Sequence, residues 1–279
     1  MERLQIAIAK ARASREEAGA RQPAAPAAPA APRGDATAPQ GGVGAWDSVE
    51  RFDPAPAALE RARVVAAQGG RGATEFDKLR TRIVQKMQAQ GWVRLAVTSP
   101  GPGCGKSTIA LNLGYGLARQ DATRVVLCEM DLRRPSLAAL LGVPRGRDFV
   151  PVLEGRAAFA DEAVRLRDNL VAGLAGQSRG QTAELLQARS TAAALDRIQA
   201  EFAPTTMLVD TPPVLVSDDT IGLLAHVDCA LIVAAAGATT IAEIDACERE
   251  VAARTEVVGV VLNKCRFSDE ASGYEYYYD

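Results

Sequence analysis

Short apolar runs alternate with helical patterns along residues 94–263. Most of these runs are followed by a segment in which apolar residues recur every three or four positions. Uniformly apolar strands that are separated by helices indicate a parallel sheet with both faces covered. The pattern therefore predicts an α/β fold with a mainly parallel central sheet flanked by helices. The expected strands are 94–99, 124–130, 169–173, 205–210, 229–235 and 257–263, and the expected helices are 107–120, 181–201, 217–225 and 239–253.

A further helix is expected just before the first strand. Phe76, Leu79, Ile83 and Met87 recur at helical spacing, and Gly91 is a typical residue at which a helix ends. We therefore expect the folded domain to occupy residues 73–265.

Three terminal segments lie outside this domain. Residues 19–72 are dominated by Ala, Pro, Gly and Arg, and they hold too little large apolar surface to offset the entropy lost on ordering. This composition predicts a flexible linker over residues 19–72. For residues 266–279, where the apolar pattern ends, we expect a disordered tail. Residues 1–18 place three apolar side chains on one helical face, so they are either a weak terminal helix or a docking helix for a partner.

Charge and cysteine content narrow the classes of protein to consider. The 279 residues include 32 basic and 34 acidic side chains, so no positive field indicates nucleic-acid binding. Five scattered cysteines without metal-site spacing are typical of reduced thiols in the cytoplasm. No window approaches the roughly 18 apolar residues of a membrane span. We expect a cytoplasmic protein that reaches the inner face of the plasma membrane through a partner.

The strongest local motif is "TSPGPGCGKSTIALNLGYGLA", in which a strand leads through a Gly-rich loop into a helix. Such a loop directs backbone N–H groups at a phosphate, and the helix N-terminus adds its positive dipole end. Lys106 can reach the β- and γ-phosphate oxygens, and the Ser107 hydroxyl can bind Mg²⁺. Pro100 stands where the strict pattern has Gly, and a Gly-rich turn that binds nothing is the alternative. The expected nucleotide contacts are Gly101, Gly103, Cys104, Gly105, Lys106, Ser107 and Thr108.

Acidic residues end two of the predicted strands. Glu129 and Asp131 follow one strand, and Asp210 ends another. In open α/β sheets ligands bind at the carboxyl ends of strands, so these acids are expected to face the phosphate loop. Asp210 suits a role in holding a metal-bound water, while Glu129 or Asp131 could order Mg²⁺ or accept a proton from an attacking hydroxyl. The alternative for each of these three acids is that it is a solvated loop carboxylate or caps a helix.

The end of the sequence, "YEYYYD", holds four of the five tyrosines. Tyrosines that pack in a core are expected within periodic elements, and these are not. Tyr274, Tyr276, Tyr277 and Tyr278 are therefore candidate phosphate acceptors on a mobile tail. The alternative is that the tyrosines are incidental or bind another protein.

Together these motifs resemble those of the bacterial tyrosine kinases, the P-loop autokinases of capsule and exopolysaccharide export. The resemblance covers residues 74–279 and rests on "SPGPGCGKST", "EMDLRRPSL", "VDTPP" and the tyrosine cluster. It implies transfer of a phosphoryl group from Mg·ATP to tail tyrosines of neighbouring subunits. It also implies a homo-oligomer and an activating membrane adaptor, the chain-length determinant of a polysaccharide exporter.

The resemblance also implies roles for individual residues. Lys106, Ser107, Asp131 and Asp210 occupy the catalytic, phosphate and metal positions, and Asn263 matches a position that often contacts the adenine. Independently of the resemblance, the positive charges of Arg133 and Arg134 could neutralise phosphate charge, and solvated side chains without that role are the alternative.

The sequence departs from the family at two places. Glu129 stands where the family has aspartate, so it is longer by one methylene. The oligomerisation motif E-x-x-R-x-x-R aligns with Thr74, Asp77 and Arg80, of which only the arginine matches. The expected ring is therefore built differently or is weaker than in the family.

Two other functions fit the phosphate loop. A partitioning-type ATPase would carry a second lysine at the position of Gly101, and the tyrosine tail would have no use in it. A non-catalytic, ATP-dependent scaffold of a polysaccharide exporter would follow if Glu129 abolished phosphoryl transfer.

Overall fold

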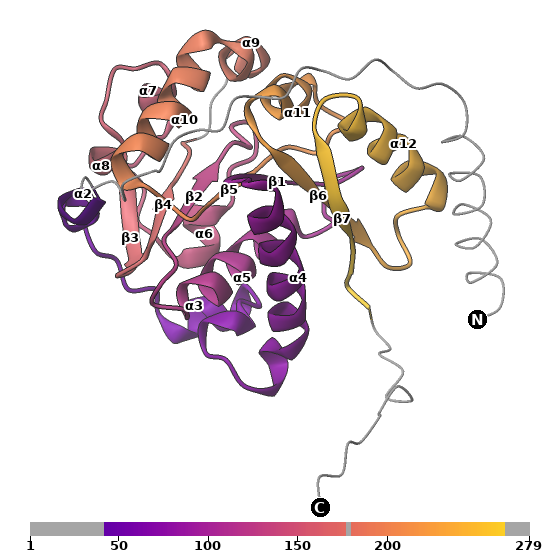
Figure 1. Cartoon of the computed structure of the whole chain (residues 1–279), viewed down its shortest axis with the longest axis horizontal. Coiled ribbons are helices and arrows are strands. Elements are labelled where there is room, and N and C mark those ends of the chain that lie inside the picture. The colour runs from indigo at the N-terminus through magenta and orange to yellow at the C-terminus, as the bar shows by residue number, and fades with distance from the viewer. Residues whose placement is uncertain (1–41, 177–179, 266–279) are drawn as a thin grey trace, which may run out of the picture. The chain divides into compact units, whose positions relative to one another are not determined.

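The computed structural model describes residues 42–176 and 180–265. Their centre is a seven-stranded sheet of order β3-β4-β2-β5-β1-β6-β7 (Figure 1). All neighbouring strands are parallel except β3 and β4, which are antiparallel. The predicted α/β class with a mainly parallel sheet is therefore confirmed. The strands are β1 (Arg94–Thr98), β2 (Val125–Glu129), β3 (Ala163–Arg167), β4 (Leu170–Gly173), β5 (Thr206–Asp210), β6 (Cys229–Ala235) and β7 (Glu256–Asn263).

The alternation of side chains along the buried strands creates two apolar cores, one on each face of the sheet. In β1, for example, Ala96 enters the first core while Leu95 and Val97 enter the second. Both cores are needed because every residue of β2 and β5 is buried. This is why these strands are almost uniformly apolar in the sequence.

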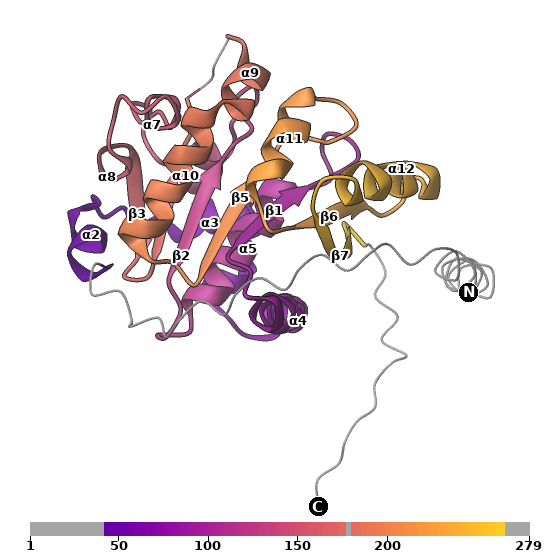
Figure 2. The ribbon, with the colours of Figure 1, turned by 45° about the horizontal axis from the view of Figure 1, so that its top comes forward.

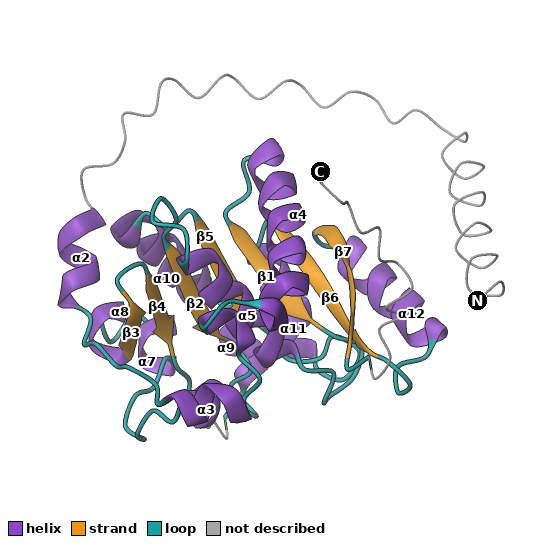
Figure 3. Cartoon of the chain, turned by 90° about the horizontal axis from the view of Figure 1, so that it is seen from below, coloured by secondary structure: helices purple, strands orange, loops and turns teal. Residues whose placement is uncertain are grey.

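Helices cover both faces of the sheet, as Figure 2 and Figure 3 show from two directions. The helices α4 and α5 contribute to one core, and α10 and α12 contribute to the other. None of the described helices is long and apolar enough to cross a bilayer. From residue 74 on, the described helices are α4 (Thr74–Gln90), α5 (Lys106–Ala118), α6 (Leu137–Leu141), α7 (Val150–Leu153), α8 (Phe159–Glu162), α9 (Thr182–Gln187), α10 (Arg189–Phe202), α11 (Asp218–Leu223), with the 3-10 turn η3 (Leu224–His226), and α12 (Ile241–Ala252).

The structure corrects the prediction of a flexible linker for the part that covers residues 42–72. This segment forms α2 (Gly42–Ser48), α3 (Pro56–Arg61) and the 3-10 turns η1 (Val65–Ala67) and η2 (Arg71–Ala73). Trp46 is buried and its indole nitrogen donates to the Phe202 carbonyl at 2.9 Å. The prediction failed because small side chains supply much of the packing, so the segment needs little large apolar surface. Residues 1–41 and 266–279 lie outside the described part, so the expectations for them stay predictions.

The edge strand β3 and the short helices α6, α7 and α8 were not predicted. In β3, Arg165 and Arg167 interrupt the apolar run, which hid the strand. Its outer side is covered by the segment after α2, since Phe52 N donates to Arg165 O and Arg165 N donates to Glu50 O. The predicted helix 181–201 is divided, because Ala188 adopts an extended conformation between α9 and α10.

Candidate active site

The phosphate loop lies between β1 and α5 and depends on glycine at two positions. Gly103 and Gly105 have φ angles of 76° and 94°, a region that side chains other than glycine rarely adopt. A Cβ atom on Gly105 would also lie 2.2 Å from Nδ2 of Asn263. The sequence pattern of this loop is thus a direct requirement of its backbone path.

Lys106 and Ser107 form the first turn of α5, directly after the loop. Lys106 is 8% exposed although it carries a charge. The Ser107 hydroxyl accepts a hydrogen bond of 2.9 Å from Ser136 Oγ, which lies just before α6. The loop after β2 is therefore attached directly to the phosphate-binding turn.

A cleft of about 680 Å³ opens in front of this turn. It brings together predicted residues of the phosphate loop and predicted residues of the loop after β2. Gly101, Cys104, Glu129, Asp210 and Asn263 do not line it. The cleft is lined by Pro102, Gly103, Gly105, Lys106, Ser107, Thr108, Asp131, Arg133, Arg134, Ser136, Leu140, Pro212, Pro213, Val216, Ser217 and Lys264.

Asp210 ends β5 beneath the cleft and is fully buried. Neither of its carboxylate oxygens has a hydrogen-bond partner of normal geometry within the described residues, although the Ser107 hydroxyl lies close enough to act on the carboxylate as a weak donor. Burial raises the pKa of Asp210 to about 6, although the nearby Ser107 hydroxyl and the Lys106 charge lower it. A buried carboxylate with only a weak donor needs a cation or a metal-bound water as its partner. This donor set therefore fits Mg²⁺.

Asp131 lies in the wall of the cleft and is half-buried. Its Oδ1 accepts a hydrogen bond of 3.1 Å from the backbone N–H of Arg134, which fixes its orientation. Burial raises the pKa of Asp131, while the Lys106 charge opposes the shift. No group of three or more His, Cys, Asp or Glu side chains in the described residues forms a metal site by itself. A divalent cation would therefore depend on phosphate oxygens and water for most of its ligands, as Mg²⁺ usually does.

Glu129 lies outside the lining of the cleft, and its carboxylate is bonded to backbone N–H groups. One of its oxygens accepts from Ser136 N at 2.5 Å and from Leu137 N at 2.8 Å, and the other accepts from Ala175 N at 3.0 Å. Burial raises the pKa of Glu129 to about 7 despite these donors. Its carboxylate joins the start of α6 to the end of β4. These hydrogen bonds give Glu129 a positioning role, and the expectation that it binds Mg²⁺ or accepts a proton stays a prediction.

The two arginines after Asp131 have different surroundings. The Arg133 guanidinium donates to both oxygens of the buried Asp219, at 2.8 and 3.1 Å, and to the Thr182 hydroxyl. Arg133 is thereby attached to α11 while its side chain remains 57% exposed. The Arg134 guanidinium has no ion-pair partner among the described residues. Both side chains line the cleft, in agreement with a role against phosphate charge.

Asn263 ends β7 and contacts the phosphate loop, because its Nδ2 donates to the Cys104 carbonyl at 2.9 Å. This contact was not predicted, and the expected contact with adenine stays a prediction. Cys104 is buried, with its thiol 3.3 Å from the Gly101 carbonyl. Both residues therefore shape the loop from behind the cleft.

The remaining predicted residues lie elsewhere. The acceptor candidates Tyr274, Tyr276, Tyr277 and Tyr278 fall outside the described residues. In the region of the oligomerisation motif, Asp77 forms ion pairs with Arg80 and Arg119 of its own chain.

Sequence reasoning missed several residues at the site, and three of them carry polar or charged groups that bear on its chemistry. Ser136, Asp219 and Lys264 follow recognised motifs at short distances, but only the three-dimensional structure brings them to the cleft or to a residue that lines it. For Asp219, the only signal in the sequence is its place near the start of the expected helix 217–225. Ser217 caps α11, with its side chain accepting from Asp219 N.

Comparison with known proteins agrees with this geometry. Residues 95–277 match the CobQ/CobB/MinD/ParA nucleotide binding domain family. The chain belongs to this family. Among its relatives are "Tyrosine-protein kinase ptk" of Acinetobacter johnsonii, 30% identical over 185 residues, and "Tyrosine-protein kinase CpsD" of Streptococcus pneumoniae serotype 4, 27% identical over 180 residues.

The shared region covers different fractions of these family members. It includes 64% of this chain and 24% of the Acinetobacter kinase, against 62% of this chain and 77% of CpsD. The chain thus spans about a quarter of the length of the first of these relatives. A solved structure, the chimerical protein CapA2B2, has the same fold with a TM-score of 0.66 at 22% identity, over 78% of this chain and 92% of that one.

Proposed function

We propose that this protein is an ATP-dependent protein-tyrosine kinase that phosphorylates tyrosines in the tail of neighbouring copies. The observation that carries the proposal is the fully buried Asp210 carboxylate, which has no described hydrogen-bond partner of normal geometry and lies near Lys106 and Ser107. Such a carboxylate costs free energy unless a cation is present. The names of the relatives support tyrosine as the acceptor.

The residues at the cleft would have separate roles in binding ATP and transferring its phosphoryl group. The loop N–H groups and Lys106 would bind the β- and γ-phosphates of ATP, and Ser107 with Asp210 would hold Mg²⁺ and its water. Bound Mg²⁺ would neutralise phosphate charge and fix the geometry of the transferred group. Asp131 lines the cleft with one oxygen held by Arg134 N, so it is the candidate base for the phenolic proton. Arg133 and Arg134 would stabilise the charge that develops on the phosphoryl oxygens.

The tail supplies the acceptors in this proposal. Tyr274, Tyr276, Tyr277 and Tyr278 are the phosphorylated residues. Each phosphate adds about −1.5 to −2 charges, so several on one tail would repel one another and the acidic site. Phosphorylation would therefore loosen the oligomer, which light scattering of the phosphorylated protein and of a tail Tyr→Phe variant would measure. Equal masses for the two samples would contradict this part of the proposal.

The proposed setting is the inner face of the plasma membrane. The membrane adaptor of a capsule or exopolysaccharide export system would recruit and activate the kinase, and cycles of tail phosphorylation would regulate polymerisation and export. Support comes from the resemblance of the motifs to the kinases of those systems.

Incubation with γ-labelled ATP and Mg²⁺ tests the activity, with Lys106→Met as the comparison. We expect label on tyrosine of the unaltered protein and at least about a hundredfold less on the variant, since Lys106 would stabilise the transferred group in this proposal. Release of free phosphate without labelled tyrosine would instead support a partitioning-type ATPase. Neither product, with the membrane adaptor also present, would support a scaffold.

A further inference from the structure

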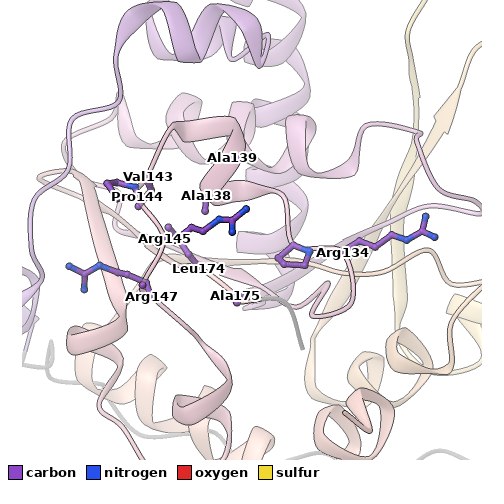
Figure 4. Close-up of a pocket in the computed structure, with 12 residues that line it drawn as sticks. Arg134, Ala138, Ala139, Val143, Pro144, Arg145, Arg147, Leu174 and Ala175 are labelled. Atoms are coloured by element: carbon purple, nitrogen blue, oxygen red, sulfur yellow. The ribbon is translucent and has the colours of Figure 1, made fainter. Parts of the chain in front are cut away.

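A second pocket lies beside the nucleotide cleft and has a volume of about 640 Å³. Arg134 lines both, so it forms a shared wall between them. The pocket lies between the segment that contains α6 and the chain that follows β4 (Figure 4). The full lining is Arg134, Pro135, Ala138, Ala139, Val143, Pro144, Arg145, Gly146, Arg147, Leu174, Ala175 and Gly176.

The charged groups of this pocket are all positive. Arg134 and Arg145 have no ion-pair partner among the described residues, whereas Arg147 pairs with Glu50. In Figure 4, Arg145 reaches across the pocket beneath Ala138, and Arg134 and Arg147 lie on opposite sides. Two cations in a concave site, neither with an ion-pair partner in the described part of the chain, would bind an anionic ligand.

The rest of the lining is apolar. Ala138, Val143 and Leu174 face the same space as the arginines. A site that combines cations with an apolar floor accommodates an aromatic ring next to a carboxylate or phosphate. This chemistry is found in an acidic, tyrosine-rich peptide.

The walls of the pocket are held by hydrogen bonds, of which those to Glu129 are buried. Glu129 accepts from Leu137 N on one wall and from Ala175 N on the other. Asp148 accepts from Gly176 N at 3.1 Å, and Phe149 N donates to Leu174 O at 2.9 Å. The pocket is therefore preorganised, which lowers the entropic cost of binding.

We propose that this pocket docks the tail, residues 266–279, of a second copy of the chain. That segment contains four acidic residues, one arginine and four tyrosines. Its charge is complementary to Arg134 and Arg145, and its phenol rings fit the apolar floor. The inference rests on the proposed function, because docking here would hold the tail next to the cleft in which the phosphoryl group is transferred.

A tail from the same copy fits less well. The described part of the chain ends just after Lys264, which lines the nucleotide cleft on the side of β7. To reach the pocket, the copy's own tail would have to pass in front of the cleft toward Arg134 and would obstruct nucleotide entry. A tail from another copy avoids this path.

Photo-crosslinking tests the occupant without requiring kinase activity. The exposed Ala139 would be replaced by p-benzoylphenylalanine in the full chain, and this protein would be mixed with an isotopically heavy, unaltered copy. We expect crosslinked peptides that join Ala139's position to heavy residues 266–279. Crosslinks confined to the light chain would show docking of the copy's own tail, and crosslinks without tail peptides would show a different ligand. Either result would overturn the proposal.

Charge reversal supplies an independent measurement on the folded chain. The probe is a fluorescent peptide with the sequence of residues 265–279, and fluorescence anisotropy measures its binding to the full chain. We expect Arg145→Glu to weaken binding about tenfold or more, and the matched variant Arg82→Glu on the exposed face of α4 to leave it unchanged. Equal affinities of the two variants would overturn the proposal. Arg145 does not line the nucleotide cleft, so retained binding of a fluorescent ADP analogue would verify the fold of the variant.

The outcomes of these experiments separate this inference from the proposed function. Peptide binding that depends on Arg145, without labelled tyrosine in the ATP assay, would retain the docking site and refute the kinase. Labelled tyrosine together with equal peptide binding by both variants would retain the kinase and refute the docking site.

Discussion

The ends of β2 and β5 lie side by side and carry carboxylates in very different surroundings. Glu129 and Asp210 are paired in register, and both are fully buried. Glu129 accepts hydrogen bonds from three backbone N–H groups, whereas Asp210 accepts none of normal geometry from the described residues. The difference shows that burial of an acid does not identify its role. The hydrogen-bond partners of the acid distinguish a carboxylate that stabilises the fold from one whose oxygens are available to bind a ligand.

The two pKa values alone would not have separated these roles. Burial is the main cause of both shifts, which raise the pKa of Glu129 to about 7 and that of Asp210 to about 6. Perturbed values occur in structural networks as well as in active sites. The contrast therefore rests on geometry, and the following substitutions test it from the largest expected effect to the smallest.

Replacing Asp210 with Asn should affect phosphoryl transfer most. Asparagine keeps the shape of the side chain but loses the negative charge that would hold Mg²⁺ and its water. We expect transfer to tyrosine to fall about a hundredfold to a thousandfold, or about 3–4 kcal/mol of transition-state stabilisation. The matched control is Asp218→Asn, an exposed carboxylate at the start of α11. Retention of more than a tenth of the activity would place the metal elsewhere.

Replacing Glu129 with Ala should affect stability instead. The substitution leaves the N–H groups of Ser136, Leu137 and Ala175 without their acceptor. We expect the free energy of unfolding to fall by about 3 kcal/mol, because each buried unpaired donor costs about 1–3 kcal/mol and water can reach some of them. Urea unfolding of this variant and of Asp210→Ala measures the contrast. Equal losses in the two variants would remove the distinction between the strand ends.

The stability of Asp210→Asn should depend on pH in a defined direction. Folding raises the pKa of Asp210 from 3.8 to about 6, so the folded protein binds its proton more tightly than the unfolded chain does. Wild type therefore loses stability relative to the variant as the pH rises from about 4 to about 6. Without Mg²⁺ we expect the variant to be more stable by about 3 kcal/mol at pH 8, since each unit of pKa difference corresponds to about 1.4 kcal/mol, and we expect this advantage to vanish below pH 4.

Thermal unfolding across this pH range, with and without Mg·ADP, measures the effect. Mg·ADP should stabilise wild type more than the variant at pH 8, because only wild type offers the carboxylate. A constant difference between the proteins at all pH values would show that Asp210 does not titrate as described.

Replacing Arg133 with Ala should have the smallest effect. Asp219 is a third fully buried carboxylate, and it keeps the Thr182 hydroxyl as a donor when the guanidinium is removed. Because the Arg133 side chain is 57% exposed, solvent screens its ion pair. We expect a loss of less than about 1 kcal/mol, read from thermal unfolding against Arg134→Ala, which should be neutral. A larger loss would give Arg133 a structural role like that of Glu129.

Sequence alone predicted the sheet and the phosphate loop because their residues repeat a local pattern. Six of the seven strands and the glycines of the loop follow from apolar runs and from backbone geometry. The strand β3 was missed because it lies at the edge, where Arg165 and Arg167 tolerate water. Residues 42–72 were missed because packing of alanines depends on partners that are distant in the sequence.

The site was predictable only in part for a related reason. The motifs indicated that Lys106, Ser107 and Asp131 would meet, since the carboxyl ends of parallel strands share one side of the sheet. They did not indicate which way Glu129 would turn, because its three donors come from the segments before α6 and after β4. The direction of a side chain is decided by tertiary partners, which one strand-end motif does not specify.

The edges of the sheet are protected in two unlike ways, and this has a consequence for self-association. Residues 50–52 pair with β3 and cover that edge, whereas β7 is met by Lys86, whose ammonium donates to the carbonyls of Val257 and Val258. Charged side chains at a sheet edge deter strand-to-strand aggregation. Among the described residues, one edge is thus covered by a chain segment and the other is met by the Lys86 side chain, so unwanted β-pairing between copies would be expected to start from the β7 side.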